Sequence, residues 1–485
     1  MEHSVYPPLG LLVDGEWIAA SARDTLPVHN PATGALLGEL PMATEADIDR
    51  AADAAHRAFG PWRRRTALER GRILAEVAAT LRRRTSELAP VLTLEQGKPL
   101  REATAEIIST ADSFEWLAEE GKRVYGRTMP SRFADTEMVV ALEPVGPVAA
   151  FSPWNFPAVL AGRKIATALA AGCPIVIKPA EESPGIVVMI ARICMECGVP
   201  PGVLNLLFGV PAQISRRLVA AKEIGKVSFT GSIPVGRRLA ELAASHLKRI
   251  TLELGGHAPV VVCDDADLDR AVTLGVAAKF RNAGQVCNCP TRFYVQHGIF
   301  DAFLERFTAA ARQLRTGNGL DEAVHMGPLV HERRVQAMRS LVDDARAHGA
   351  AVLCGGGMPE GLGLDEKAGN FWAPTVITHA GAARVSHEEP FGPLALVEEF
   401  TDLEDAIARA NGTEHGLASY AFTGSLKNAR LLEEGLQAGC FSLNTFAITP
   451  PELPYGGIKH SGLGREMGSE GLLEHFHTKA VIRAR

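Results

Sequence analysis

Apolar and polar residues alternate in two recurring patterns from residue 145 onward. Short apolar runs that end in turn residues, such as VGPVAAFSPWN and PIVIKPA, are typical of buried strands. Longer runs with apolar residues at helical spacing, such as LAGRKIATALAAG and SPGIVVMIARICMECG, lie between them. Buried strands that alternate with helices predict right-handed crossovers and a parallel sheet, so the pattern indicates an α/β fold. Such sheets bind ligands at the carboxyl ends of their strands.

The alternation continues as far as RITLELGG and then starts again. A second α/β series begins with APVVVCDDA and DLDRAVTLGVAAKFRNAG, and helices are expected around 299–315 and 331–348. Further strands are expected at TRFYVQ, GPLALVEEF, LASYAFTG and CFSLN. Residues 121–143 break the early helical region and are β-prone, as is the tail HTKAVIRAR. No repeat or low-complexity linker separates the two series, so we expect tightly packed domains.

Composition and charge place the chain among soluble globular proteins. Hydrophobic residues make up 46% of the 485 residues, charged residues make up 22%, and the net charge is −6. A chain of this length can bury enough apolar surface to need no disulfides, and a dedicated nucleic-acid binder would carry a basic excess. The Arg-rich stretches WRRRTALERGR and LRRRTSE interleave apolar and acidic residues at helical spacing, which favours amphipathic helices over a basic binding patch.

The N-terminal sequence and the cysteines indicate the compartment. MEHSVYPPLG lacks a basic segment followed by an apolar run, and no apolar stretch approaches the roughly 18 residues of a membrane-spanning helix. Eight scattered cysteines are typical of a reduced cytosolic protein. Cys194 and Cys197 have the CxxC spacing but lie late in a helical run, so packing is favoured over zinc or redox chemistry. We expect a cytoplasmic protein without a membrane partner, a nucleic-acid partner or a metal.

Two turns at the ends of expected strands suit a dinucleotide. In KVSFTGSIPVG, Gly231 and Ser232 open a helix whose free N–H groups suit a phosphate. In VIKPAE, Lys178 can meet a ribose hydroxyl or a phosphate, and Glu181 can accept bonds from ribose hydroxyls. Each turn alone has an equally good steric explanation, but two of them in one parallel sheet favour a dinucleotide site.

Three further motifs carry candidate catalytic groups. Glu253 ends the strand of TLELGG over a ligand crevice, with a helix cap as the alternative. Asn155 lies on the rigid loop SPWNFP, where its amide suits a developing oxyanion. FRNAGQVCNCPTRF contains Cys287 and Cys289, which could be metal ligands, a disulfide, buried packing, or a nucleophile with a neighbour.

These motifs, in the order P-W-N-F-P, F-T-G-S, E-L-G-G, F-x-N-x-G-Q-x-C, E-x-F-G-P and PYGGIKHSGLGRE, carry a family resemblance. The sequence resembles the NAD(P)-dependent aldehyde dehydrogenase superfamily over essentially its whole length. The resemblance implies a Rossmann-like parallel-sheet cofactor domain at 1–120 and 144–253 and a second α/β catalytic domain at 254–455. It also implies a small β oligomerisation arm and C-terminal segment at 121–143 and 456–485, in a homodimer or homotetramer.

The resemblance also implies roles for individual residues. Cys287 would be the nucleophile, Glu253 the general base, and Asn155 with the Cys287 backbone N–H the oxyanion hole. A small-molecule aldehyde would be oxidised through a Cys287 thioester, and Glu253 favours hydrolysis over transfer to coenzyme A. Lys164 and Glu466 match a proton path to the base. The residues implied for the cofactor are Trp154, Lys178, Glu181, Gly231, Ser232, Leu254, Glu389 and Phe391.

NAD is the implied cofactor, with NADP as the alternative. Glu181 would repel the 2′-phosphate of NADP at close range, which favours NAD. Lys178 beside it could neutralise that phosphate, which leaves NADP open.

Within the superfamily, GRKIATALAAGC, KFRNAGQVC and GREMG are most similar to succinate-semialdehyde and α-ketoglutarate-semialdehyde dehydrogenases. The resemblance implies that Arg163 and Arg281 bind the distal carboxylate of the substrate through charge-assisted bonds. Without it, Arg281 would be interpreted as an exposed helix residue. Thr449 stands where a serine usually helps to bind the carboxylate of succinic semialdehyde, and TPPELPYGG is more similar to the α-ketoglutarate-semialdehyde group.

Two other functions remain open. One is a broad-specificity dehydrogenase of unrelated aliphatic or aromatic aldehydes. The other is a catalytically retired structural protein, like the lens crystallins built on this fold, but the intact Cys287, Glu253 and Asn155 argue against it.

Cys289 has two interpretations. It is either a small buried side chain behind the active site, or a resolving thiol that forms a disulfide with an oxidised Cys287. The second rests on Cys287 being an accessible thiolate of low pKa, which oxidants attack first. A bridge across one intervening residue would close a strained and easily reduced ring.

Overall fold

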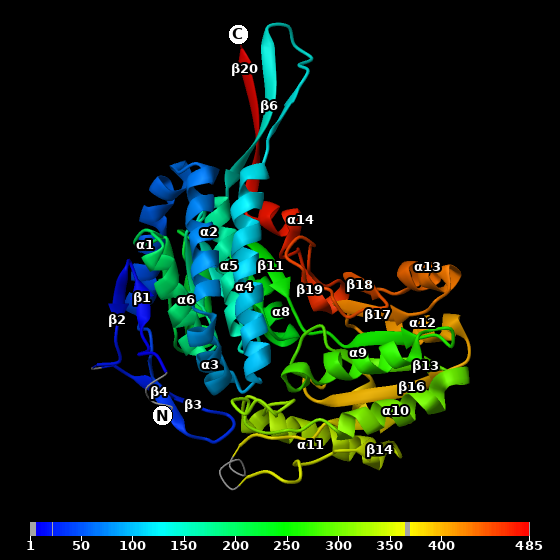
Figure 1. Ribbon diagram of the computed structural model, residues 1–485. Coiled ribbons are helices and arrows are strands. Elements are labelled where there is room, and N and C mark those ends of the chain that lie inside the picture. Colours follow the sequence, from blue (N-terminus) through cyan, green and yellow to red (C-terminus); the bar gives the residue numbers. More distant parts are fainter. Residues whose placement is uncertain (1–5, 22, 364–368, 485) are drawn as a thin grey trace.

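The computed structural model describes residues 6–21, 23–363 and 369–484, which form two bodies and a projecting arm (Figure 1). Each body is built around one large sheet, and the two sheets have separate apolar cores. The α/β fold with parallel-sheet domains that the sequence predicts is therefore confirmed. Within the described part of the chain, no helix has both the length and the apolar character needed to cross a membrane.

The first body contains an eight-stranded sheet. Its strands are β1 (Leu11–Val13), β2 (Glu16–Ile18), β7 (Val148–Phe151), β8 (Ile175–Lys178), β9 (Leu204–Leu206), β10 (Lys226–Thr230), β11 (Arg249–Glu253) and β19 (Gly462–Leu463). The order is β19-β11-β10-β7-β8-β9-β1-β2. The five central strands run parallel, and antiparallel strands extend both sides of the sheet. A separate hairpin joins β3 (Thr25–His29) to β4 (Leu36–Pro41).

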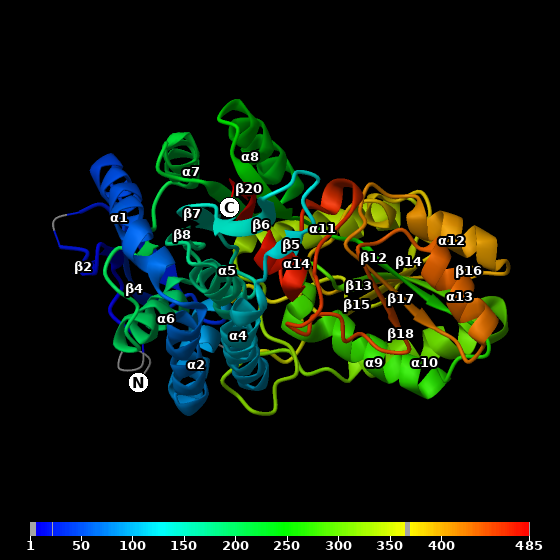
Figure 2. The ribbon, with the colours of Figure 1, turned by 90° about the horizontal axis from the view of Figure 1, so that it is seen from above.

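Helices cover this sheet. They are α1 (Glu45–Arg64), α2 (Ala67–Arg83), α3 (Thr85–Gln96), α4 (Leu100–Glu120), α5 (Pro157–Ala171), α6 (Pro184–Glu196), α7 (Pro211–Ala220), α8 (Ile233–Ser245) and α14 (Gly468–Leu473). The crossovers α5 to α8 connect the parallel strands, and Figure 2 shows α2 and α4 beside α5 and α6. Each crossover helix carries a proline in its first two positions, so the short loops after the strands lead directly into helices.

The second body contains a seven-stranded sheet. Its strands are β12 (Ala258–Val262), β13 (Pro290–Gln296), β14 (Ala351–Cys354), β15 (Thr375–Thr378), β16 (Leu394–Phe400), β17 (Ala418–Phe422) and β18 (Cys440–Leu443). Its helices are α9 (Leu268–Phe280), α10 (Phe300–Arg312), α11 (Glu332–Ala347), α12 (Leu403–Asn411) and α13 (Leu426–Gly435). The order is β14-β15-β16-β13-β12-β17-β18, and β14 is the antiparallel member.

The arm is a three-stranded antiparallel sheet that projects from the first body (Figure 1). It consists of β5 (Arg127–Met129), β6 (Thr136–Pro144) and β20 (Phe476–Ala484). The β-prone segments of the sequence therefore pair with one another. That this arm joins copies of the chain stays a prediction.

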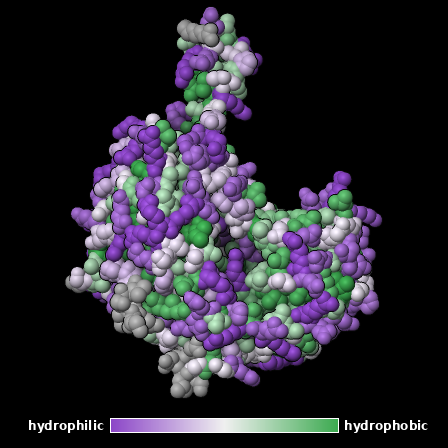
Figure 3. Space-filling model, viewed as in Figure 1, coloured by the Kyte–Doolittle hydropathy of each residue, from purple (hydrophilic) through white to green (hydrophobic). Residues whose placement is uncertain are grey.

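The chain passes from the first sheet to the second immediately after β11. Glu253 ends β11 and Ala258 begins β12, so four residues connect the bodies at this point. Figure 3 shows that the surface is hollowed where the two bodies meet. The carboxyl end of β11 is therefore placed at the junction.

Candidate active site

Two cavities meet at the thiol of Cys287, and both have Leu160 in their walls. The first, here called the arginine cavity, has a volume of about 320 Å³, and the second, the glycine cavity, about 490 Å³. Residues of the arginine cavity include Arg101, Phe156, Val159, Arg163, Arg281, Val286, Thr449 and Tyr455. Residues of the glycine cavity include Trp154, Thr230, Gly231, Ser232, Glu253, Leu254, His331, Glu389 and Phe391. A thiol between two cavities can react with one molecule while a second lies beside it.

A left-handed stretch of backbone places Cys287. Residues 282–284 have φ angles between 49° and 69°, a conformation that is costly outside glycine. A Cβ at Gly284 would clash with the carbonyl of Gly392, so this position requires glycine. The buried side chain of Gln285 donates to the backbone of the same loop and accepts an N–H from a neighbouring segment. The loop is therefore held rigidly.

Burial raises the pKa of the Cys287 thiol to about 11. The Tyr455 hydroxyl, 3.2 Å from Sγ, and Arg163 lower this pKa, whereas Glu389 and Glu253 raise it. The expectation of a low-pKa thiolate is therefore wrong for the chain alone, because the site removes water from the sulfur. Tyr455 lies in the motif PYGGIKHSGLGRE, but its contact with Cys287, far away along the chain, was not predicted.

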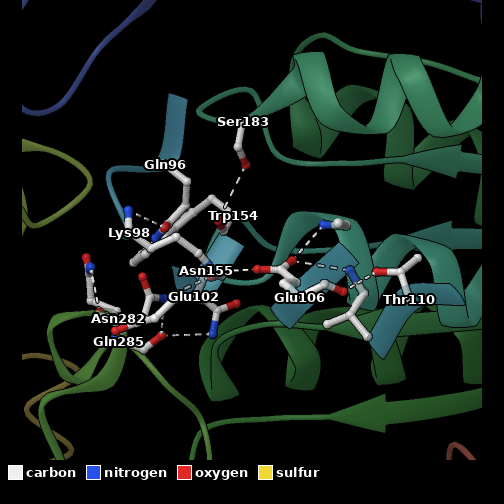
Figure 4. Close-up of polar contacts among 12 residues, drawn as sticks. Gln96, Lys98, Glu102, Glu106, Thr110, Trp154, Asn155, Ser183, Asn282 and Gln285 are labelled. Carbon is white, nitrogen blue, oxygen red and sulfur yellow. Dashed lines mark hydrogen bonds and ion pairs between the residues drawn. The ribbon is translucent and has the colours of Figure 1, made fainter. Parts of the chain in front are cut away.

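Asn155 lies beside the Cys287 loop and is almost fully buried. Its side-chain Nδ2 donates to the carbonyl of Gln285 at 3.1 Å, and its backbone carbonyl accepts from Lys98 Nζ and Asn282 Nδ2, each at 2.9 Å (Figure 4). The backbone of Asn155 is therefore held in place and one N–H of its side-chain amide is bound, whereas the second N–H of Nδ2 has no acceptor among the described residues. Such a group suits an oxyanion.

A buried ion pair supports the loop that carries Asn155. Lys98 and Glu106 pair with side chains that are 0% and 1% exposed. Glu106 Oε1 accepts the N–H groups of Ala158 and Val159 at 2.9 and 3.2 Å, and so caps the first turn of α5 (Figure 4). Lys98 Nζ also lies 3.9 Å from the centre of the Phe156 ring. Sequence reasoning missed this pair because lysine and glutamate side chains are almost never fully buried unless they are paired.

Glu253 is buried at the end of β11, and neither carboxylate oxygen has a hydrogen-bond partner within the described ranges. Burial raises the pKa of this carboxyl well above its usual range, and Glu466 raises it further, against Lys164 and two arginines. A Cβ at Gly456 would lie 2.7 Å from Oε1, so glycine is needed there. A carboxyl whose pKa is raised is a stronger base than an ordinary glutamate, which suits it to proton transfer.

Lys164 and Glu466, the two residues predicted for a proton path, form an ion pair, and their role in proton transfer stays a prediction. Ser228 joins them, because it accepts from Lys164 Nζ at 2.8 Å and donates to Glu466 Oε1 at 3.2 Å. Ser228 lies on β10 opposite Thr251, and Thr230 lies opposite Glu253. One face of these two buried strands is thus polar close to Glu253.

The glycine cavity fits a dinucleotide. It lies at the start of α8, where Ser232 is the N-cap residue and leaves helix N–H groups free for a phosphate. The buried hydroxyl of Thr230 in its wall has no partner among the described residues. Leu254 and Phe391 add apolar walls, and Phe391 packs edge-on against Trp154 at 5.5 Å between ring centres. The cavity therefore offers both polar and flat apolar contacts.

Glu389 closes the same cavity. Its Oε1 accepts the N–H of Gly256 at 3.1 Å, and burial raises its pKa to about 8. His331, which sequence reasoning missed, lies edge-on to Trp154.

Lys178 and Glu181 are not among the residues that line this cavity. Lys178 Nζ lies 2.5 Å from Glu181 Oε1, and the next residue, Glu182, does line the cavity. Because the two side chains pair, the charge of Glu181 is partly neutralised before any phosphate arrives. The repulsion expected from the sequence is therefore weakened.

The arginine cavity brings together the two predicted substrate arginines. Arg163 is buried on α5, with Nε lacking a partner in the described structure. Arg281 follows the end of α9, is exposed, and lies 5.2 Å above the Phe156 ring. Arg101, which sequence reasoning missed, instead donates to the carbonyls of residues 324 and 325. Arg163 and Arg281 remain the cationic groups available to an anion in this cavity.

Cys289 is buried and lines neither cavity. Its Sγ accepts a bond from Lys279 Nζ at 3.3 Å, and it is a free thiol. Its resolving role stays a prediction. The CxxC cysteines Cys194 and Cys197 are also free thiols, at the end of α6. Searching the described ranges reveals no group of three or more His, Cys, Asp and Glu residues placed to hold a metal ion.

Comparison with known proteins shows which protein family has a similar sequence and fold. The model of the aldehyde dehydrogenase family matches residues 17–481. A putative 4-(hydroxymethyl)benzenesulfonate dehydrogenase of Comamonas testosteroni is 48% identical, over 97% of each chain. The NADP⁺-dependent succinate-semialdehyde dehydrogenase of Escherichia coli K12 is 44% identical over 96% of each chain. The crystal structure of succinate-semialdehyde dehydrogenase from Burkholderia pseudomallei is 41% identical, with a TM-score of 0.95 and 99% of each chain covered.

Proposed function

The chain belongs to the aldehyde dehydrogenase family, and on that basis we propose that it oxidises an aldehyde with a distal carboxylate to the acid. Succinic and α-ketoglutaric semialdehyde are the proposed substrates, and the cofactor is NAD(P)⁺. The observation that carries the substrate class is the pair Arg163 and Arg281 in one cavity with Cys287. Guanidinium groups bind carboxylates by charge-assisted, bidentate bonds.

The first half of the reaction uses Cys287 and Asn155. The sulfur attacks the aldehyde carbon from its place between the two cavities, and the carbonyl oxygen becomes an oxyanion. The amide of Asn155 and the backbone N–H of Cys287 donate to this oxygen. Arg163 and Arg281 hold the distal carboxylate, so the aldehyde is oriented while it reacts.

Thr230, Ser232, Leu254, Glu389 and Phe391 would hold the cofactor in the glycine cavity. The bound cofactor would supply the hydride acceptor for the aldehyde carbon, which is chemistry that the side chains of the protein do not have.

The second half of the reaction uses Glu253. Its carboxylate takes a proton from a water molecule, and the resulting nucleophile hydrolyses the thioester at Cys287. Lys164, Glu466 and Ser228 lie in contact with one another and are proposed to pass that proton onward.

An aldehyde with a distal sulfonate is a second candidate substrate. One relative is named for a benzenesulfonate, and the arginine cavity has apolar walls at Phe156, Val159 and Val286 that suit an aromatic ring. Kinetics of the purified enzyme with succinic semialdehyde, α-ketoglutaric semialdehyde, 4-formylbenzenesulfonate, hexanal and benzaldehyde separates these classes. Equal kcat/KM for hexanal and the anionic aldehydes would instead indicate a broad-specificity enzyme.

Arg163→Ala and Arg281→Ala should each raise KM for the preferred anionic aldehyde about ten- to a hundredfold, because a charge-assisted bond is worth roughly 1.5–3 kcal/mol. KM for hexanal should change little, since hexanal has no distal charge. Arg101→Ala is the matched control, because the Arg101 guanidinium is already bound to backbone carbonyls. If KM rises equally for the anionic aldehyde and for hexanal, the two arginines are structural and the proposed substrate class is wrong.

NAD should be preferred over NADP, because Glu181 pairs with Lys178 and so withholds the lysine charge from the 2′-phosphate of NADP. Glu181→Gln leaves Lys178 unpaired, so kcat/KM with NADP relative to NAD should rise about tenfold. Steady-state kinetics with both cofactors at saturating aldehyde measures this ratio. An unchanged ratio would show that Glu181 takes no part in cofactor choice.

A further inference from the structure

The hydroxyl of Tyr455 contacts the reactive sulfur directly. Tyr455 Oη lies 3.2 Å from Cys287 Sγ, and the tyrosine is only 4% exposed. In the described structure, this sulfur is the one hydrogen-bond partner of the hydroxyl. A buried phenol hydroxyl normally has a hydrogen-bond partner, and for Tyr455 that partner is the sulfur of Cys287.

The backbone fixes the direction of this side chain. The N–H of Tyr455 donates to the carbonyl of Glu466 at 2.7 Å, and the N–H of Glu466 donates back at 2.8 Å. The next residue is Gly456, where a Cβ would lie 2.7 Å from Glu253 Oε1. The segment therefore runs between the nucleophile and the proposed base, with no room to shift toward the base.

Only one direction of this hydrogen bond is possible once Cys287 has lost its proton. A thiolate has no hydrogen, so the phenol O–H must donate and the sulfur must accept. Two carboxyl groups, Glu253 and Glu389, oppose a negative charge on this sulfur, and burial opposes it too. A buried anion without a donor is costly, and hydrogen bonds to charged groups are the strong ones.

We propose that Tyr455 is a catalytic residue of this site, whose hydroxyl donates a hydrogen bond to the sulfur of Cys287 and stabilises its anionic form. The proposal rests on Cys287 being the nucleophile of the proposed function. The same bond acts twice, because the sulfur is an anion when it attacks the aldehyde and again when it leaves the thioester during hydrolysis. Tyr455 keeps its proton throughout.

Tyr455→Phe tests this proposal, because it removes one oxygen and keeps the ring. The measurement is the rate at which iodoacetamide alkylates Cys287 as a function of pH, resolved by peptide mass spectrometry from the other cysteines. Neither aldehyde nor cofactor is present, so the outcome does not depend on the proposed substrate. At pH 7.5 alkylation should fall about tenfold, and the pH midpoint should rise by about one unit.

Tyr420→Phe is the matched control. Tyr420 is also buried, and its hydroxyl donates to the carbonyl of Asn288 at 2.8 Å and not to the sulfur. This variant should keep the wild-type midpoint even if it melts at a lower temperature. An unchanged midpoint in Tyr455→Phe would overturn the proposal. An alkylation rate that falls equally at all pH values in both variants would also overturn it, because such a fall indicates a packing effect alone. If the midpoint shifts in Tyr455→Phe but the wild-type enzyme oxidises none of the tested aldehydes, the role of Tyr455 is supported and the proposed substrate class is refuted.

Discussion

Cys287→Ala is expected to abolish aldehyde oxidation, with a loss on the order of 10⁴-fold or more, while cofactor binding stays near normal. Cys287 is the one cysteine that lines the two described cavities, and the other chemical groups of the site cannot form a thioester. The measurement pairs NADH formation at saturating aldehyde with NAD binding followed by tryptophan fluorescence.

Cys197→Ala provides the control for this variant. Cys197 is half-buried at the end of α6 and lines neither cavity, so its removal should leave turnover intact. If Cys287→Ala retained more than a few per cent of wild-type turnover, Cys287 would not be the nucleophile.

Glu253→Gln should separate the two halves of the reaction. The thioester should still form, so one equivalent of NADH appears in a burst, but steady turnover should fall about 10²- to 10⁴-fold because the general base is gone. Stopped-flow absorbance follows both phases. Glu474→Gln is the control, because it removes a partly exposed carboxylate beside Lys226. This variant should show no burst of NADH followed by slow turnover. An unchanged steady rate in Glu253→Gln would remove Glu253 from the base role.

The pH dependence of hydrolysis should change in the same variant. Burial raises the pKa of Glu253 well above its usual range, so this carboxyl loses its proton at a higher pH than an ordinary glutamate does. Only the deprotonated form can accept a proton, and therefore wild-type hydrolysis should accelerate as the pH rises. Glu253→Gln has no such group, and its slow hydrolysis should lose that acceleration.

The parallel sheets follow from the sequence because their strands are continuous apolar runs with helices between them. The N-terminal strands β1 and β2 were not foreseen: LLV and EWI are three residues each, and nothing local indicates that β1 pairs with β9, nearly 200 residues away. The strand β14 was missed for a related reason, since its residues are only half-buried.

The functional site also contains both residues that could be predicted from the sequence and residues that could not. Residues at or just after the ends of strands, such as Glu253 and Ser232, could be predicted because a parallel sheet collects strand ends at one edge. Lys98 and Tyr455 could not, because their roles depend on long-range packing that buries them beside Asn155 and Cys287. Contact partners of this kind have no fixed spacing along the chain.

The two cavities that meet at Cys287 take most of their walls from different parts of the chain. α4, α5 and Thr449 form much of the arginine cavity, whereas the loop after β7, the carboxyl ends of β10 and β11 with the residues that follow them, and residues near 331–334 and 389–391 form much of the other. Mutations can therefore alter the choice of aldehyde in evolution without disturbing hydride transfer. For inhibitor design, a cysteine-reactive compound gains selectivity by extending toward Arg163 and Arg281, because the opposite direction leads into a pocket shaped for a cofactor common to the whole family.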